Sequence, residues 1–120
     1  MSYKLTCSNL LLVALFSALV PTALASTTWY VNGVSGSDSN NCMSSTTACK
    51  TIGRAISLAS SGDFILVAPA IYTENLTISF SVTVIGAGAS TTVIDGGGVG
   101  RVIYLPSQTA QITLWGVDNP

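Results

Sequence analysis

Short segments of β-prone residues, separated by turn-forming residues, make up the second half of this 120-residue chain. The segments are residues 64–68, 76–78, 82–85, 92–94, 101–105 and 111–115. Clusters such as Gly96-Gly97-Gly98 and Pro106-Ser107 stand between them, and no helical periodicity interrupts the series. Short strands that are joined by tight corners are typical of two architectures, the β-sandwich and the β-solenoid.

A recurring pair of β-branched residues favours the solenoid. The pair Val-Ile occurs at residues 84–85, 93–94 and 102–103, and such internal repetition is the sequence signature of stacked architectures. Stacking places like residues above one another, so that each coil buries its apolar face against the next coil. We therefore predict an all-β fold built as a solenoid.

One helix is predicted, and it precedes these strands. Apolar residues recur at the i, i+3, i+4 and i+7 spacing of a single helical face at Ile52, Ala55, Ile56 and Ala59. Gly62 follows as a residue that can end the helix. Because the end of a stack exposes apolar side chains and unpaired backbone groups, we expect this helix to cap it.

The N-terminus has the three parts of a secretory signal peptide. Lys4 is followed by an apolar run over residues 10–20 and by small residues that end at Ala25. The alternative is a membrane anchor, but the run is much shorter than the roughly 20 residues that span a bilayer. We predict cleavage after Ala25, no membrane span after it, and a secreted, periplasmic or cell-surface protein.

Two cysteines remain after cleavage, Cys42 and Cys49. An oxidising compartment permits them to form a disulfide, which we predict as a local staple. The alternative is a zinc site, but two thiolates without histidine or a second cysteine pair cannot complete a tetrahedral shell. No metal site is therefore expected.

A resemblance to a known family rests on the helix and the segments that follow it. The residues that carry it are Lys50-Thr51-Ile52, Arg54-Ala55-Ile56, Gly62-Asp63, Val67-Ala68-Pro69, residues 72–78, residues 84–88 and Ile94-Asp95-Gly96. Their order resembles the N-terminal cap and first coils of pectin-lyase-like proteins, as in pectinesterases and exported bacterial β-helix proteins. The resemblance covers residues 29–117 and implies a right-handed parallel β-helix, of which this chain holds the N-terminal portion with one capping α-helix.

The expected organisation has four parts. Residues 1–25 are a signal peptide, 26–49 an N-terminal strand and disulfide loop, 50–62 the capping helix, and 63–120 the first coils of the β-helix. Because a solenoid needs about three repeats or more and a cap at each end, we expect the last part to be incomplete. Its open edge would favour self-association.

Composition excludes several classes of function. The chain has no histidine, which removes histidine general-base chemistry, and it has a net charge of -1, which does not suit a nucleic-acid-binding surface. The resemblance places the catalytic residues of pectinesterases and pectate lyases in later coils, so we assign no catalytic residue. No cofactor is expected.

Few other residues are candidates for a site. Trp115 is predicted to face outward, where its ring could stack on a sugar, and Trp29 and Tyr30 offer the same option. Asn75 begins the sequon Asn75-Leu76-Thr77, an acceptor in a eukaryotic secretory pathway. Residues 38–41 have oxygen ligands but lack the glycine and distal glutamate of a calcium loop, which favours an Asx-rich turn.

Two functional hypotheses remain. The chain is a non-catalytic surface or glycan-associated module with a polysaccharide as its partner, or it is the N-terminal fragment of a polysaccharide-active enzyme of the pectinesterase or pectate-lyase kind. The first is favoured because paired carboxylates of the kind that hydrolyse glycosides are missing. Asp95, the best-placed acid, precedes three glycines and is expected to bind backbone N–H groups of its own turn.

Overall fold

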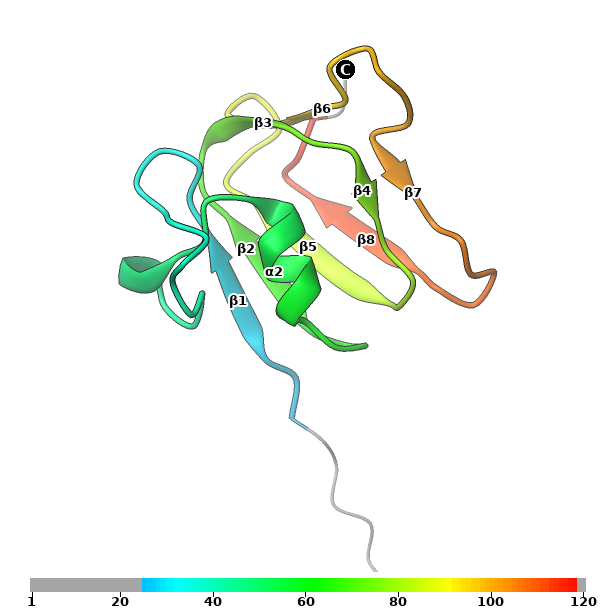
Figure 1. The fold of residues 1–120 in the computed structure, drawn as a ribbon, viewed down its shortest axis with the longest axis horizontal. Helices are drawn as coiled ribbons and strands as arrows, with labels where there is room; N and C mark the ends of the chain where they lie inside the picture. The colour runs from blue at the N-terminus through cyan, green and yellow to red at the C-terminus, as the bar shows by residue number, and fades with distance from the viewer. Residues whose placement is uncertain (1–24, 119–120) are drawn as a thin grey trace, which may run out of the picture.

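Four short parallel strands form the largest sheet of the computed structural model, which describes residues 25–118 (Figure 1). The strands are β1 (Thr28–Val31), β2 (Phe64–Val67), β5 (Val82–Gly86) and β8 (Ile112–Trp115). They lie in the order β1-β2-β5-β8, and each pair is parallel. Parallel neighbours need a crossover between them, and the other elements of the chain supply these crossovers.

Two smaller parallel sheets lie beside the first. One consists of β3 (Ala70–Thr73) and β6 (Thr92–Asp95), and the other of β4 (Leu76–Thr77) and β7 (Ile103–Tyr104). Tyr72 and Leu76 lie in β3 and β4, and both side chains are buried. The three sheets therefore share one hydrophobic core.

Alternation along the strands separates a core face from a solvent face. In β2 the side chains of Ile65 and Val67 are buried while that of Phe64 is exposed. Ile65 is aligned with Val84 of β5, which is also buried. Successive side chains of a strand point to opposite faces, so each strand of the largest sheet turns one set of residues inward and the other outward.

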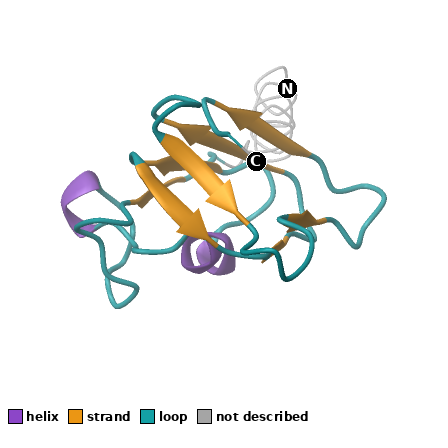
Figure 2. Ribbon diagram, turned by 90° about the horizontal axis from the view of Figure 1, so that it is seen from above, coloured by secondary structure: helices purple, strands orange, loops and turns teal. Residues whose placement is uncertain are grey.

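Helix α2 (Ile52–Leu58) packs against β1 and β2 (Figure 2). Its core-facing residues are those of the predicted apolar face, and Ile52, Ala55 and Ile56 are all buried. Thr51 is the N-cap, with its side-chain oxygen accepting from the Arg54 N–H at 3.1 Å. The helix ends at Leu58 with Ala59 as C-cap, so Gly62 lies beyond it and is not the residue that ends it.

The segment that holds the disulfide covers the outer edge of β1. The N–H groups of Tyr30 and Asn32 donate to the carbonyls of Cys42 and Cys49 at 2.8 and 2.7 Å. In return the Cys49 N–H donates to the Tyr30 carbonyl at 2.9 Å. A short 3-10 helix, η1 (Ser45–Thr47), lies within this loop. The backbone groups of β1 are thus paired on both sides.

The predicted right-handed parallel β-helix is wrong. A solenoid repeats the same set of strands at least about three times, whereas two of the three sheets in residues 25–118 stop at two strands. The structure is a small domain of short parallel strands in small sheets with one helix, and no solenoid is found. The three Val-Ile pairs fall in or beside β5, β6 and β7, which belong to three different sheets, and the buried member is Val84 in the first pair but Ile94 in the second.

Other differences are local. The sequence did not predict β3, where Ile71 is 71% exposed and the inward positions are Ala70 and Tyr72, so its apolar alternation is weak. The proposed signal peptide lies outside the described residues, apart from Ala25. None of the helices among residues 25–118 has the length and apolar character that a membrane-spanning segment requires.

Candidate functional site

The outward face of the four-stranded sheet carries one continuous row of large apolar side chains. The strand register aligns Tyr30 with Leu66, Leu66 with Ile85, and Ile85 with Trp115, so one residue comes from each strand. We call these four residues the outer row. Trp115 is 64% exposed, and the other three are half-buried. None of the four belongs to the hydrophobic core or packs against it.

A second outward row lies two residues earlier along each strand. Its members, again in register, are Thr28, Phe64, Thr83 and Thr113. Phe64 is 37% exposed, and the three threonines offer hydroxyl groups beside the outer row. Neither row contains a charged residue. The sheet therefore presents an uncharged, partly aromatic surface with hydroxyl groups along one side.

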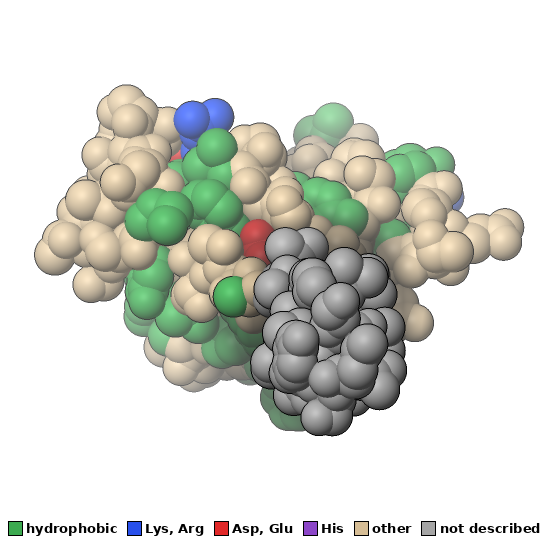
Figure 3. Space-filling view, turned by 90° about the horizontal axis from the view of Figure 1, so that it is seen from below, with side chains coloured by type: hydrophobic (Ala, Val, Ile, Leu, Met, Phe, Trp, Pro, Cys, Tyr) green, Lys and Arg blue, Asp and Glu red, His purple; other side chains and the backbone are tan. Residues whose placement is uncertain are grey.

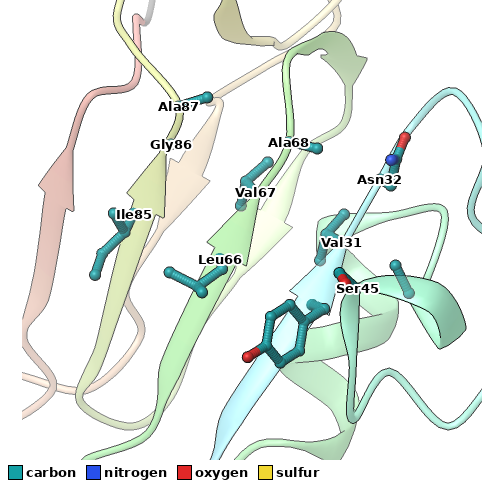
Figure 4. A pocket seen from close by; sticks show the side chains of 11 residues that line it. Val31, Asn32, Ser45, Leu66, Val67, Ala68, Ile85, Gly86 and Ala87 are labelled. Carbon is teal, nitrogen blue, oxygen red and sulfur yellow. The ribbon is translucent and has the colours of Figure 1, made fainter.

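A groove of about 250 Å³ lies over the β1, β2 and β5 part of the outer row (Figure 4). Leu66 and Ile85 line it from neighbouring strands, together with Tyr30. Ser45 and Ala48 line it from the disulfide loop. Apolar pockets with a few polar groups at the margin are the usual form of ligand-binding sites. The groove thus gives part of the outer row a concave and mainly apolar form.

The predicted disulfide is confirmed. Cys42 and Cys49 are bonded, and their Cα atoms are 4.9 Å apart. Both side chains are fully buried, and the bond closes the loop that lies along β1. The disulfide therefore fixes the wall of the groove and has no free thiol with which to react. It is compatible with an extracellular protein, because disulfides persist in oxidising compartments.

Asp63 is the most buried carboxylate, with 6% of its surface exposed. Its oxygens accept from the Thr27 N–H, the Ser60 N–H and the Trp29 indole, each at 2.9 Å. Burial alone would raise the pKa of Asp63, but these hydrogen bonds outweigh it and lower the pKa below its ordinary value. Through these hydrogen bonds the Asp63 carboxylate joins β1 to the segment before β2. The indole N–H of Trp29 is likewise engaged, and the half-buried Trp29 side chain packs against the hydrophobic core.

Two further carboxylates hold the start of α2. Asp38 accepts from the N–H groups of Lys50 and Thr51 and from the Thr51 hydroxyl, each at 2.9 Å. Burial opposes its ionisation, but these hydrogen bonds and the nearby charge of Arg54 lower the pKa of Asp38. Glu74 accepts from the Ile52 and Gly53 N–H groups at 2.9 and 2.8 Å. Neither contact could be predicted from local sequence, because both join segments far apart along the chain.

The remaining polar candidates also make hydrogen bonds within the fold. Asp95 accepts from the Gly97 N–H at 2.8 Å, which confirms the predicted turn. Asn75 donates from Nδ2 to the carbonyls of Arg101 and Gly96 at 2.9 and 3.3 Å. No group of three or more His, Cys, Asp or Glu side chains that could hold a metal is found among residues 25–118. Of the cluster at residues 38–41, Asp38 supplies the hydrogen bonds that hold the start of α2.

The predicted outward position of Trp115 agrees with its exposure, while its role in sugar stacking stays a prediction. Sequence reasoning did not identify Leu66 and Ile85 as its neighbours, because only the strand register shows which residues align. Alternation within each segment could have identified the outward positions, but not their order across the sheet. Figure 3 shows a face of the molecule on which charged side chains are few.

Comparisons with known proteins identified no relative of this chain. No protein family, curated protein or solved structure matches this chain. The resemblance to pectin-lyase-like proteins therefore stays a prediction.

Proposed function

We propose that this protein is an exported, non-catalytic module that binds polysaccharide on the outward face of its four-stranded sheet. The observation that carries the proposal is the outer row, in which Tyr30 and Trp115 stand at the two ends and Leu66 and Ile85 lie between them. Flat apolar surfaces edged by hydroxyl groups suit sugar rings, which have apolar faces and polar rims. The rigid sheet holds the four side chains in place before any ligand arrives.

The acids of the molecule support a binding role over hydrolysis. Glycoside hydrolysis uses two carboxyl groups that face each other across the bond, roughly 5 to 10 Å apart. Asp38, Asp63, Glu74 and Asp95 each accept hydrogen bonds from backbone N–H groups. None of these four carboxylates lines the groove. Binding in the groove therefore needs none of the four carboxylates that the fold already uses elsewhere.

Export is part of the proposal. Residues 1–25 have the composition of a signal peptide, and the Cys42–Cys49 disulfide suits the compartment to which such a peptide leads. A protein that binds extracellular polysaccharide requires such a route. The mass of the exported product from a secreting host tests cleavage after Ala25, and retention of the full-length mass would contradict it.

Affinity gel electrophoresis tests the binding role. The protein should be retarded in gels that contain polysaccharide, and Trp115→Ala should abolish most of the retardation because it removes the most exposed ring of the outer row. Tyr104→Ala is the matched control, since Tyr104 is 46% exposed but lies on β7 in a different sheet. Equal retardation of both variants, or none for the unmodified protein across neutral and acidic polysaccharides, would refute the proposal.

A further inference from the structure

We infer that the outer row binds a neutral, extended polysaccharide chain that lies across the strands, and that it does not recognise polymers of sugar acids. This inference rests on the proposed polysaccharide-binding role and adds the chemical class and the orientation of the ligand. It follows from three features of the described residues: where the charges lie, how long the row is, and what borders it.

The binding surface lacks the groups that recognise a carboxylated sugar. Carboxylates are bound by Arg or Lys side chains, which supply charge-assisted hydrogen bonds. No charged residue lines the groove or belongs to either outward row. A carboxylate laid on this surface would lose its hydration without gaining a partner, which is costly.

The basic residues of the described part of the chain lie elsewhere. Arg54 is on α2, and Lys50 immediately precedes the N-cap of that helix. Arg101 lies over the ring of Tyr104 on β7, with its guanidinium carbon 5.3 Å from the ring centroid. Residues 25–118 contain these three basic side chains against five acidic ones, a net charge of 3 - 5 = -2. The field of the domain therefore repels polyanions.

The length of the row indicates an extended ligand. Tyr30 lies on β1 and Trp115 on β8, at the two ends of the four-stranded sheet. Neighbouring strands are about 4.8 Å apart, so the row spans roughly 14 Å. A single sugar ring cannot touch both aromatic side chains at this separation. A chain that runs perpendicular to the strands can do so and can rest on Leu66 and Ile85 between them.

The borders of the row carry polar but uncharged groups, beside Phe64 on one side and Ala68 and Ala87 on the other. Thr28, Thr83 and Thr113 lie along one side in the second outward row. Ser45 and Asn32 line the groove on the other side. Hydroxyl and amide groups both donate and accept, so they match the hydroxyl groups of a neutral sugar without a fixed charge.

The first experiment compares two soluble polymers in affinity gels with the full chain. Hydroxyethyl cellulose represents a neutral extended chain, and polygalacturonate represents an acidic one. We expect retardation by hydroxyethyl cellulose alone, unchanged when salt is raised, because salt screens only charge interactions. Retardation by polygalacturonate that salt abolishes would overturn this inference but would keep the proposed binding role. Absence of retardation in both gels, and in gels of other polysaccharides, would refute the binding role itself.

The second experiment tests orientation by chain length. Calorimetric titration with cello-oligosaccharides from glucose to cellohexaose should show affinity that rises at least about tenfold up to the length that reaches from Tyr30 to Trp115 and then levels off. Trp115→Ala and Tyr30→Ala should each remove most of this rise, while Tyr104→Ala should retain it. Thermal unfolding of each variant checks that the fold is intact. Equal affinity for glucose and the longer sugars would contradict a chain that spans the row.

Discussion

Single carboxylates in this protein bind backbone N–H groups that would otherwise be unpaired. Asp63 shows this most clearly, because it accepts from two backbone N–H groups and one indole while almost fully buried. Hydrogen bonds to a charged acceptor contribute more than those between neutral groups. The charge of Asp63 therefore stabilises the junction between β1 and the segment that leads to β2.

Replacing this charge should weaken the fold. We expect Asp63→Asn to lower the free energy of unfolding by about 3 kcal/mol, because an amide supplies one acceptor oxygen where the carboxylate supplies two. Asp95→Asn is the control, since Asp95 lies in an exposed turn with a single such bond to Gly97; it should cost under about 1 kcal/mol. Urea denaturation measures both, and equal losses would contradict the role of Asp63.

Acid should destabilise the protein through the same groups. Asp63 and Asp38 both have lowered pKa values in the folded state, so the unfolded chain binds protons that the folded chain does not. The stability they add is complete above their unfolded pKa of about 3.9 and is lost as pH falls through the lower folded values. Urea midpoints should hold from pH 7 to about pH 5 and fall below about pH 4. A urea midpoint that already falls near neutral pH would show that groups other than Asp38 and Asp63 cause the acid sensitivity.

Some residue roles could be predicted from sequence and others could not. The pairing of Cys42 with Cys49 and the turn at Asp95 follow from neighbours within a few positions, so local reasoning reached them. The contacts of Asp63 and Glu74 join residues separated by many positions in the chain. They depend on the crossovers that bring β1, α2 and β3 together, and no local pattern encodes them.

Whole elements were predicted to the extent that their residues alternate or repeat cleanly. Helix α2 has its apolar face where the spacing predicted it, but it ends at Leu58, before Gly62. β3 was not predicted because the large apolar Ile71 faces solvent while the small Ala70 faces inward. This is the opposite of the pattern expected for a half-buried strand. The residue at which a helix or strand ends depends on contacts with other segments. The ends of the elements were therefore harder to predict than their central residues.

Close packing fixes the end of β5 beside the residues that follow β8. A side chain at Gly86 would clash with the Gly116 carbonyl and with Val117. We expect Gly86→Ala to lower the free energy of unfolding by about 2 kcal/mol, because the clash is with backbone and forces the strands apart. Gly100→Ala is the control, since it meets no atom within 4 Å. Thermal unfolding compares the two, and equal melting temperatures would contradict this packing.

The Cys42–Cys49 disulfide should stabilise the folded protein. Replacing both cysteines by Ser in the pair Cys42→Ser and Cys49→Ser removes a bond that closes a loop with a sequence separation of 7. The expected loss is about 2 kcal/mol, chiefly because the unfolded chain gains freedom. Urea denaturation with and without dithiothreitol measures it. The reduced protein should have the same stability as the double variant. An unchanged stability on reduction would contradict a stabilising role of the disulfide.

At the scale of the molecule, parallel pairing creates a surface that no single segment contains. The predicted solenoid failed because the second and third sheets end at two strands each. The register of the first sheet nevertheless brings Tyr30, Leu66, Ile85 and Trp115 into one row from segments spread over most of the described chain. Sequence alternation predicted that Trp115 faces outward, but only the register showed that it forms one surface with the other three residues.

Nuclear magnetic resonance titration tests this surface most directly. Adding cellohexaose to the isotopically labelled protein should shift the backbone amide signals of Tyr30, Leu66, Ile85 and Trp115 together, with one shared dissociation constant, because one chain contacts all four residues. The indole signal of Trp115 should shift with them, while that of Trp29, bonded to Asp63, should not. Shifts confined to other parts of the molecule, or no shifts at all, would contradict the outer row as the binding site.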